Sequence, residues 1–136
     1  MNKTLATFIL SLSTLFNTSS FAETTIDIGH SHDLYREAMS DLLGIHGKQK
    51  SSTKAFHKFE LLARQGWKTA QLMLGNLYAK GEGTTKNQVR AYLWYSVATR
   101  QDFTIAEEKL VSLKKRLTQA QINEAEWLVS NWTREK

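Results

Sequence analysis

Apolar residues recur at intervals of three and four along most of this chain, from about residue 32 to residue 132. That spacing is close to the 3.6-residue period of an α-helix and differs from the alternation of a half-buried strand. The pattern therefore predicts an all-α protein. The expected helices cover residues 32–43, 51–65, 69–80, 87–101, 104–116 and 118–132.

The expected helix starts carry residues that cap helices. Ser51, Asn87 and Thr118 each precede a helix, where a side-chain oxygen can accept a hydrogen bond from a free backbone amide. Thr118 and Gln121 also have the spacing of a capping box. The chain contains no proline, so no helix interior is broken by that residue.

A shift of 36 residues superposes three segments of the chain, and the turns follow it. Gly47 falls on Gly83, and Gly66 falls on Asp102. Glycine reaches the left-handed conformation that ends a helix, as expected for Gly66 and Gly81, and aspartate tolerates it better than most residues. A fixed period of this size is typical of stacked helical hairpins, each of which buries its apolar face against the next. The units cover about residues 34–66, 70–102 and 106–132.

The third unit departs most from the repeat because its turn lacks both glycines. Its last helix ends with Trp127, Leu128 and Trp132. A terminal unit needs a cap over its apolar end. We therefore expect these three side chains to close the end of the core.

The central unit carries a specific order of small and aromatic residues: Ala70, Leu74-Gly75-x-x-Tyr78, Gly81-x-Gly83 and Arg90-Ala91-x-x-Trp94-Tyr95-x-x-Ala98. This order resembles the Sel-one-like repeat (SLR) family, which is related to the tetratricopeptide repeats. The resemblance implies a short right-handed α-solenoid, here of about three antiparallel helix pairs. It also implies an adaptor or scaffold in protein assemblies, often in bacterial envelopes. The motif residues themselves are expected to be structural, filling or narrowing the seam between helices.

The first 22 residues have the features of a cleavable signal peptide. Lys3 precedes an apolar run at residues 5–16, and Ser20, Phe21 and Ala22 form the small-x-small pattern of a cleavage site. The run is shorter than the roughly 20 residues that span a bilayer as a helix. We expect cleavage after Ala22 and a periplasmic or secreted protein without an integral membrane anchor, with retention as an anchor the alternative.

The expected domain organisation follows from that signal. Residues 1–22 form the signal peptide, residues 23–31 a flexible N-terminal tail, and residues 32–136 the helical repeat domain. The absence of cysteine excludes disulfides, thiolate metal sites and thiol catalysis. The formal net charge of +5 favours an acidic partner over nucleic acid, with simple solubility as the other explanation.

The histidines give the one metal hypothesis. His30 and His32 could hold a metal weakly, but a stable site needs further ligands held in place. Nothing in the sequence ties His46 or His57 to that pair. No cofactor motif is present, and no serine stands in a recognisable nucleophile motif. We therefore expect no enzyme, and keep a cell-envelope hydrolase (cell wall or β-lactam type) and a metal-binding periplasmic protein as alternatives.

Positive charge gathers near one helix end, at Lys109, Lys114, Lys115 and Arg116. This run either complements the helix dipole or forms a patch for an acidic partner. By resemblance to tetratricopeptide proteins, the first helix of each hairpin lines the concave side. We expect an acidic peptide or protein segment to dock there, with the oligomeric state open. The candidate binding residues are Arg36, Ser40, Thr69, Asn76, Lys80, Glu108, Ser112, Lys115 and Arg116.

Overall fold

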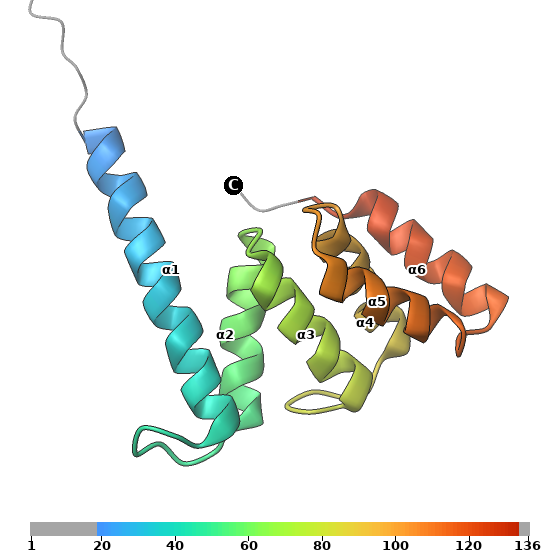
Figure 1. Cartoon of the computed structure of the whole chain (residues 1–136), viewed down its shortest axis with the longest axis horizontal. Helices are drawn as coiled ribbons and strands as arrows, with labels where there is room; N and C mark the ends of the chain where they lie inside the picture. The colour runs from blue at the N-terminus through green and yellow to red at the C-terminus, as the bar shows by residue number, and fades with distance from the viewer. Residues whose placement is uncertain (1–18, 134–136) are drawn as a thin grey trace, which may run out of the picture.

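The computed structural model describes the backbone of residues 19–133 and the side chains of residues 29–133. Most of the expected signal segment, residues 1–18, lies outside this part of the chain. The described part is helical and contains no strand, which confirms the all-α prediction (Figure 1). Its helices are α1 (Ser19–Leu43), α2 (Ser52–Arg64), α3 (Lys68–Lys80), α4 (Gln88–Thr99), α5 (Thr104–Lys114) and α6 (Gln119–Asn131).

The observed bounds of α2 to α6 fall within two residues of those expected, but α1 begins much earlier. It starts at Ser19 rather than near residue 32, so residues 23–31, expected as a flexible tail, are helical. The cleavage position expected after Ala22 falls inside this helix. Neither a proline nor a capping contact interrupts the helix before its packed part. The packed part begins at Ser31, which is buried, and at His32, whose ring meets Trp67 edge-on at 4.7 Å between centroids.

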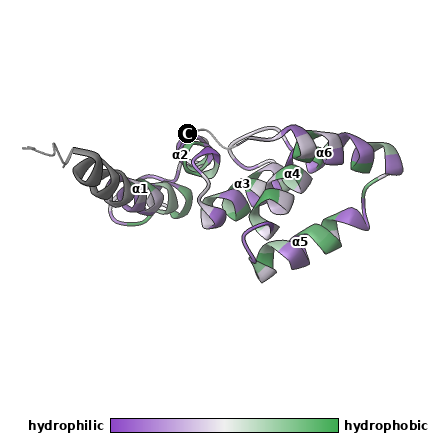
Figure 2. Ribbon diagram, turned by 90° about the horizontal axis from the view of Figure 1, so that it is seen from above, coloured by the Kyte–Doolittle hydropathy of each residue, from purple (hydrophilic) through white to green (hydrophobic). Residues whose placement is uncertain are grey.

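Each helix packs against the next one along the chain from α1 to α5, as expected for stacked hairpins. The third hairpin differs, because α5 and α6 both pack against α4 and make little contact with each other. Figure 2 shows them on opposite sides of α4. Each presents a narrow apolar stripe, with Ala106 and Leu113 buried on α5 and Ile122 and Ala125 on α6. The two helices of the third predicted antiparallel pair, α5 and α6, are therefore separated from each other by α4.

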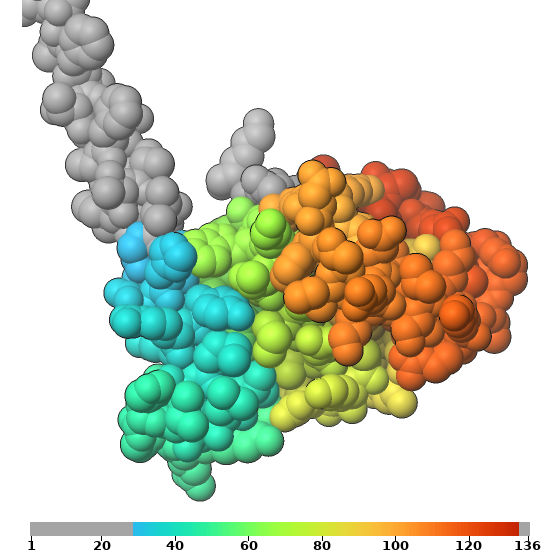
Figure 3. Space-filling view, viewed as in Figure 1, coloured from blue at the N-terminus to red at the C-terminus, as the bar shows by residue number. Residues whose placement is uncertain are grey.

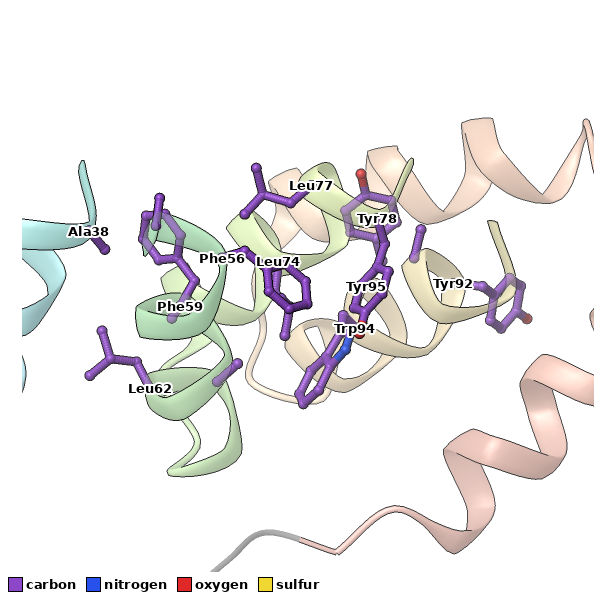
Figure 4. Packing of buried hydrophobic residues seen from close by; sticks show 14 of the residues in the cluster. Ala38, Phe56, Phe59, Leu62, Leu74, Leu77, Tyr78, Tyr92, Trp94 and Tyr95 are labelled. Atoms are coloured by element: carbon purple, nitrogen blue, oxygen red, sulfur yellow. The ribbon is translucent and has the colours of Figure 1, made fainter. Parts of the chain in front are cut away.

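The core runs through the middle of the stack and is centred on α4. Every residue of α4 from Ala91 to Ala98 is buried. Figure 4 shows its aromatic side chains beside those of α2 and α3. Phe56 and Tyr78 meet edge-on with ring centroids 5.3 Å apart. The expected role of the motif aromatics in the seam is confirmed, since Tyr78, Trp94 and Tyr95 are all buried.

The capping predictions are confirmed. The Ser51 side chain accepts from the Lys54 amide, and the Asn87 side chain accepts from the Arg90 amide. At the start of α6, Thr118 and Gln121 form the complete capping box. These contacts satisfy amide groups that have no partner inside the helix.

The turns repeat as the 36-residue shift predicts. Gly47 and Gly83 have φ angles of 73° and 75°, and both lie in the left-handed region. Gly66 and Asp102, which also superpose, have φ angles of 98° and 53°. Gly81 ends α3 in the left-handed conformation with φ 70°. The repeat is thus visible in the backbone as well as in the sequence.

One prediction about the C-terminal cap is wrong. Trp127 is 63% exposed and does not close the core. It lies two residues after Ala125, which places it about 200° around α6 from the face that packs on α4. Trp132 does pack there, edge-on to Trp94 with centroids 6.0 Å apart, and Leu128 is partly buried against the core.

Candidate functional site

A small hollow separates α3 from α5, with α4 beneath it. The two helices run in roughly the same direction on the face seen in Figure 1, and Figure 3 shows that face with its side chains filled in. The space measures about 230 Å³, below the roughly 300–1,000 Å³ of typical small-molecule pockets. It suits a single side chain better than a cofactor. We call it the α3–α5 hollow, and its lining residues are Asn76, Ala79, Lys80, Tyr95, Lys109, Ser112 and Arg116.

The floor of the hollow depends on a close contact between two helices. A Cβ atom added at Gly75 would lie 2.5 Å from Cε1 of Tyr95, so only glycine leaves room for the ring. The ring then directs its hydroxyl towards the next residue of α3. Tyr95 Oη donates a hydrogen bond to Asn76 Oδ1 at 2.8 Å. Burial raises the pKa of Tyr95 to about 12, against a smaller opposing effect of the Arg116 charge.

The walls of the hollow are positively charged. Lys80, Lys109 and Arg116 are exposed and form no ion pair with any carboxylate in the described part of the chain. Lys80 is the last residue of α3, and Arg116 follows α5 by two residues. Cations at these positions are favoured by the negative ends of the helix dipoles. Together with Lys109 in the middle of α5, these two residues direct three uncompensated charges towards one small space.

The structure brings together four of the nine candidate binding residues: Asn76, Lys80, Ser112 and Arg116 line the α3–α5 hollow. Glu108 and Lys115 lie instead with Glu107 and Val111 along the outer side of α5, where Ser112 also contributes. Tyr95 was expected only as a core residue, yet it also forms the floor of the hollow. Its place in the repeat motif predicted that the ring is buried. The sequence alone does not distinguish an aromatic residue buried in the core from one that also forms the floor of a groove.

The three other candidate residues lie elsewhere on the first helices. Thr69 lies near Tyr35 of α1 and hydrogen-bonds to it. Arg36 and Ser40 line a separate hollow at the end of α1, together with Asp33, Glu37, His46 and Lys48. The predicted single groove is therefore divided into separate regions.

The polar groups of the hollow at the end of α1 largely pair with one another. Arg36 donates to Asp33 at 2.6 Å, and Ser40 Oγ and His46 Nδ1 are 3.1 Å apart. A serine beside a histidine can act as a nucleophile when an acid orients the other ring nitrogen. None of the described carboxylates hydrogen-bonds to His46, and Ser40 is buried. The contact joins the end of α1 to the loop that follows.

A cluster of charges beneath that hollow joins α1 to α2. Lys58 Nζ lies 2.7 Å from Asp41 Oδ2 and 2.8 Å from Glu37 Oε2, and Lys48 lies 3.4 Å from Asp41 Oδ1. The hydrogen bond from Lys58 lowers the pKa of Asp41, against the opposing effect of burial. Burial alone would lower the pKa of Lys58, but its hydrogen bonds to the two carboxylates raise it overall. Each of these charged groups already has a partner of the opposite sign, and the cluster therefore contributes to the stability of the fold.

The histidine pair of the metal hypothesis does not converge with other ligands. His30 is exposed, and the His32 ring packs against Trp67. Within residues whose side chains are described, no group of three or more histidine, aspartate or glutamate side chains is placed to hold a metal ion. Separately, none of the described helices combines the length and the apolar character needed to cross a membrane.

Comparisons with known proteins find similarity at the level of structure. No protein-family model matches the chain, and no curated protein matches it. Among solved structures, it is similar to the crystal structure of a protective antigen that is present in uropathogenic Escherichia coli strains and displays an SLR fold. The TM-score is 0.69, with 28% sequence identity over 73% of this chain. The chain spans 21% of the length of that protein.

Proposed function

Because this chain is a helical repeat protein with the Sel-one-like repeat (SLR) fold, we propose that it binds an acidic segment of another protein along the face formed by α3 and α5. The observation that carries the proposal is the α3–α5 hollow, into which Lys80, Lys109 and Arg116 project without carboxylate partners in the described chain. Uncompensated charge in a concave site attracts ligands of the opposite sign.

The shape and chemistry of the hollow favour a protein segment over the other acidic partners. Single-stranded nucleic acids are held largely by bases stacked on exposed aromatic rings. The aromatic residue of this hollow, Tyr95, is only 3% exposed and offers no such platform. A cofactor-sized ligand would exceed the available space. A peptide can place one side chain in the hollow and extend along the open faces of α3 and α5.

The proposal is tested by reversing charges in the protein and measuring how much of the partner protein each variant captures. The variant Lys80→Glu/Arg116→Glu changes two walls of the hollow, whereas Lys54→Glu/Lys86→Glu changes the net charge equally at exposed positions outside it. A photoreactive residue placed at Ser112 should crosslink a partner peptide whose sequence, read by mass spectrometry, is rich in aspartate and glutamate. Capture should fall at least about tenfold in the first variant. Equal capture by both variants would refute the proposal.

We also propose that the protein works outside the cytoplasm, with a signal peptide removed after Ala22. The support is the basic, apolar and small-residue order of residues 1–22. Intact-mass analysis of the protein from the cell-envelope fraction should give a chain that begins at Glu23. Recovery of a chain that still carries residues 1–22 in the cytoplasmic fraction would contradict export.

A further inference from the structure

We propose that one edge of the molecule docks on the surface of an anionic phospholipid bilayer, with lysines among the lipid phosphates and two apolar side chains in the headgroup region. The edge consists of residues 43–54, from the end of α1 to the first turn of α2, and residues 81–90, from the end of α3 to the first turn of α4. We call it the basic loop edge. None of its residues lines the α3–α5 hollow, so the inference goes beyond the proposed function and does not depend on it.

The two segments form one continuous surface. Ser52 Oγ donates a hydrogen bond to Glu82 Oε1 at 3.2 Å. A Cβ atom added at Gly83 would lie 2.2 Å from the Ser52 carbonyl oxygen, so the two backbones are in contact. Figure 1 shows both loops at the same end of the helix stack, and Figure 3 shows this edge at the bottom of the space-filling view. The edge is therefore a fixed part of the fold.

Most of the positive surplus of the chain lies on this edge. Residues 43–54 contain three lysines and no carboxylate, and residues 81–90 contain a lysine, an arginine and one glutamate. The formal surplus of the two segments is thus +4, against +5 for the whole chain. An edge with this surplus attracts an anionic surface. Its basic residues are Lys48, Lys50, Lys54, Lys86 and Arg90.

The lysines of the edge are available to an anion outside the molecule. Lys54 and Lys86 are exposed and form no ion pair with any carboxylate in the described part of the chain. The Lys50 side chain lies 3.4 Å from Glu82 but is 62% exposed, and such a pair holds its lysine only weakly. Asp41, just before the first segment, is buried and already paired. Little in the fold therefore offsets the charge of the edge.

Two apolar side chains are exposed on the same edge. Leu43 is 55% exposed and Ile45 is 41% exposed, and both belong to the segment that carries three of the lysines. Surfaces that lie on a bilayer combine these two residue types. Their apolar side chains enter the boundary between headgroups and acyl chains, while the lysine ammonium groups stay at the level of the phosphates.

The same residues favour a bilayer over a nucleic acid or an acidic protein. Four of the five cations are lysines, which lack the planar fork that lets arginine recognise a phosphate or carboxylate in one fixed geometry. The fifth, Arg90, lies over the Tyr78 ring with 5.9 Å between the guanidinium and the ring centroid, and it is thus held against the fold. Neither segment contains a phenylalanine, tyrosine or tryptophan that could stack on a base.

The test measures co-sedimentation of the protein, in the form recovered from cells, with two kinds of vesicle. One kind is phosphatidylcholine alone, and the other contains phosphatidylcholine and phosphatidylglycerol in equal parts. The protein should bind the anionic vesicles and not the neutral ones, and binding should weaken as salt is added, because salt screens the attraction. Equal binding to both kinds of vesicle would overturn the inference. Binding to soluble polyglutamate without binding to the anionic vesicles would also overturn it, in favour of an acidic protein.

A pair of double variants separates the edge from the general effect of net charge. Lys54→Glu/Lys86→Glu should weaken binding to anionic vesicles at least about tenfold, because each change replaces attraction to the lipid phosphates with repulsion. Lys68→Glu/Arg100→Glu makes the same change in net charge at exposed positions, which lie at the opposite ends of α3 and α4. This control should bind nearly as the wild type does. Equal weakening by the two variants would overturn the inference.

A second pair tests the apolar contact. Leu43→Ser/Ile45→Ser should weaken binding to anionic vesicles at least about fivefold, because it removes the side chains that enter the headgroup region. Leu61→Ser/Ile105→Ser removes two side chains of similar exposure away from the edge and should bind as the wild type does. Circular dichroism of each variant checks that the fold is retained. Undiminished binding by folded Leu43→Ser/Ile45→Ser would overturn the proposed contact.

The orientation of the docked protein can be read from a label, since the chain contains no cysteine. Gln49→Cys places a thiol on the basic loop edge, and Gln65→Cys places one just after α2, at the opposite end of that helix. With a polarity-sensitive dye on each thiol, anionic vesicles should shift the emission of the first protein to the blue and leave the second unchanged. A shift at Gln65→Cys alone would overturn the inference.

The inference and the proposed function can fail separately. Lys54→Glu/Lys86→Glu should lose the vesicles and keep the partner protein, whereas Lys80→Glu/Arg116→Glu should keep the vesicles and lose the partner. If Lys80→Glu/Arg116→Glu loses the vesicles while Lys54→Glu/Lys86→Glu retains them, the lipid contact lies at the α3–α5 hollow and the inference is wrong.

Discussion

Gly75 of α3 and Tyr95 of α4 are in contact so close that a single added carbon would not fit. A Cβ atom at Gly75 would lie 2.5 Å from Cε1 and 2.6 Å from Cδ1 of the tyrosine ring. Glycine within a helix costs about 1 kcal/mol relative to alanine. Here that cost is offset by the packing of the ring, which also forms the floor of the α3–α5 hollow. One residue pair thus joins the core to the candidate site.

Gly75→Ala should lower the free energy of unfolding by about 1–3 kcal/mol, because overpacking outweighs the better helix propensity of alanine. Urea unfolding followed by circular dichroism measures the change. Gly29→Ala is the matched control, since Gly29 also lies in a helix but has nothing within 4 Å of the added carbon. The control should be as stable as the wild type or slightly more stable. A Gly75→Ala protein of unchanged stability would show that the ring has room to move.

A second glycine pair isolates the contact between repeats. Gly47 and Gly83 have nearly equal φ angles, 73° and 75°, so alanine is strained at both. A Cβ at Gly83 would also lie 2.2 Å from the Ser52 carbonyl oxygen, whereas at Gly47 nothing lies within 4 Å. Gly83→Ala should therefore destabilise the protein by about 1–3 kcal/mol more than Gly47→Ala. Thermal unfolding of the two variants gives the difference, and equal melting temperatures would contradict it.

Local features of the fold were predictable from the sequence, because they depend on residues close together in the chain. The caps at Ser51, Asn87 and Thr118 and the left-handed turn at Asp102 formed as expected. The early start of α1 was missed because residues 23–31 have no helical apolar pattern, although nothing in them stops a helix. The separation of α5 from α6 was missed because both helices pack against α4. Contacts of this kind, between segments that are distant in the sequence, are not visible in a local pattern.

The candidate site was predictable only in part for the same reason. Projection of first helices onto one concave face placed nine residues together, and four of them, Asn76, Lys80, Ser112 and Arg116, line the α3–α5 hollow. It assumed that α1 contributes to the same groove as α3 and α5. Arg36 instead pairs with Asp33 in a hollow of its own. Side-chain pairing of this kind depends on geometry that a repeat period does not contain.

The cluster of Lys58, Asp41 and Glu37 predicts a loss of stability at both ends of the pH range. Because the pKa of Asp41 is lowered, ionised Asp41 stabilises the folded protein fully above the ordinary aspartate pKa of about 3.9. This stabilisation is lost as the pH falls through the lower pKa that Asp41 has in the folded state. Because the pKa of Lys58 is raised, charged Lys58 stabilises the folded protein fully below the ordinary lysine pKa of about 10.4. This stabilisation is lost as the pH rises through the higher pKa that Lys58 has in the folded state. Urea unfolding from pH 3 to pH 11 should show both losses.

Two variants assign this pH dependence to the cluster. Asp41→Asn should be less stable than the wild type at pH 7, and the difference should shrink as pH falls below about 4. Asp33→Asn removes a carboxylate from an exposed pair with Arg36 and should have little effect at any pH. A difference between Asp41→Asn and the wild type that stays constant from pH 7 to pH 3 would place the acid sensitivity elsewhere.

The two tryptophans near the end of α6 should differ in their effects, although they lie five positions apart in the sequence. Trp132 meets Trp94 edge-on at 6.0 Å and is half-buried, so Trp132→Phe should lose part of that contact and Trp132→Ala should cost about 1–3 kcal/mol. Trp127 is 63% exposed, and Trp127→Ala should leave the unfolding free energy within about 0.5 kcal/mol of the wild type. Acrylamide quenching gives an independent measure, because removal of Trp127 should abolish the most accessible part of the fluorescence. If Trp127→Ala proves the more destabilising substitution, α6 packs on α4 through the opposite face.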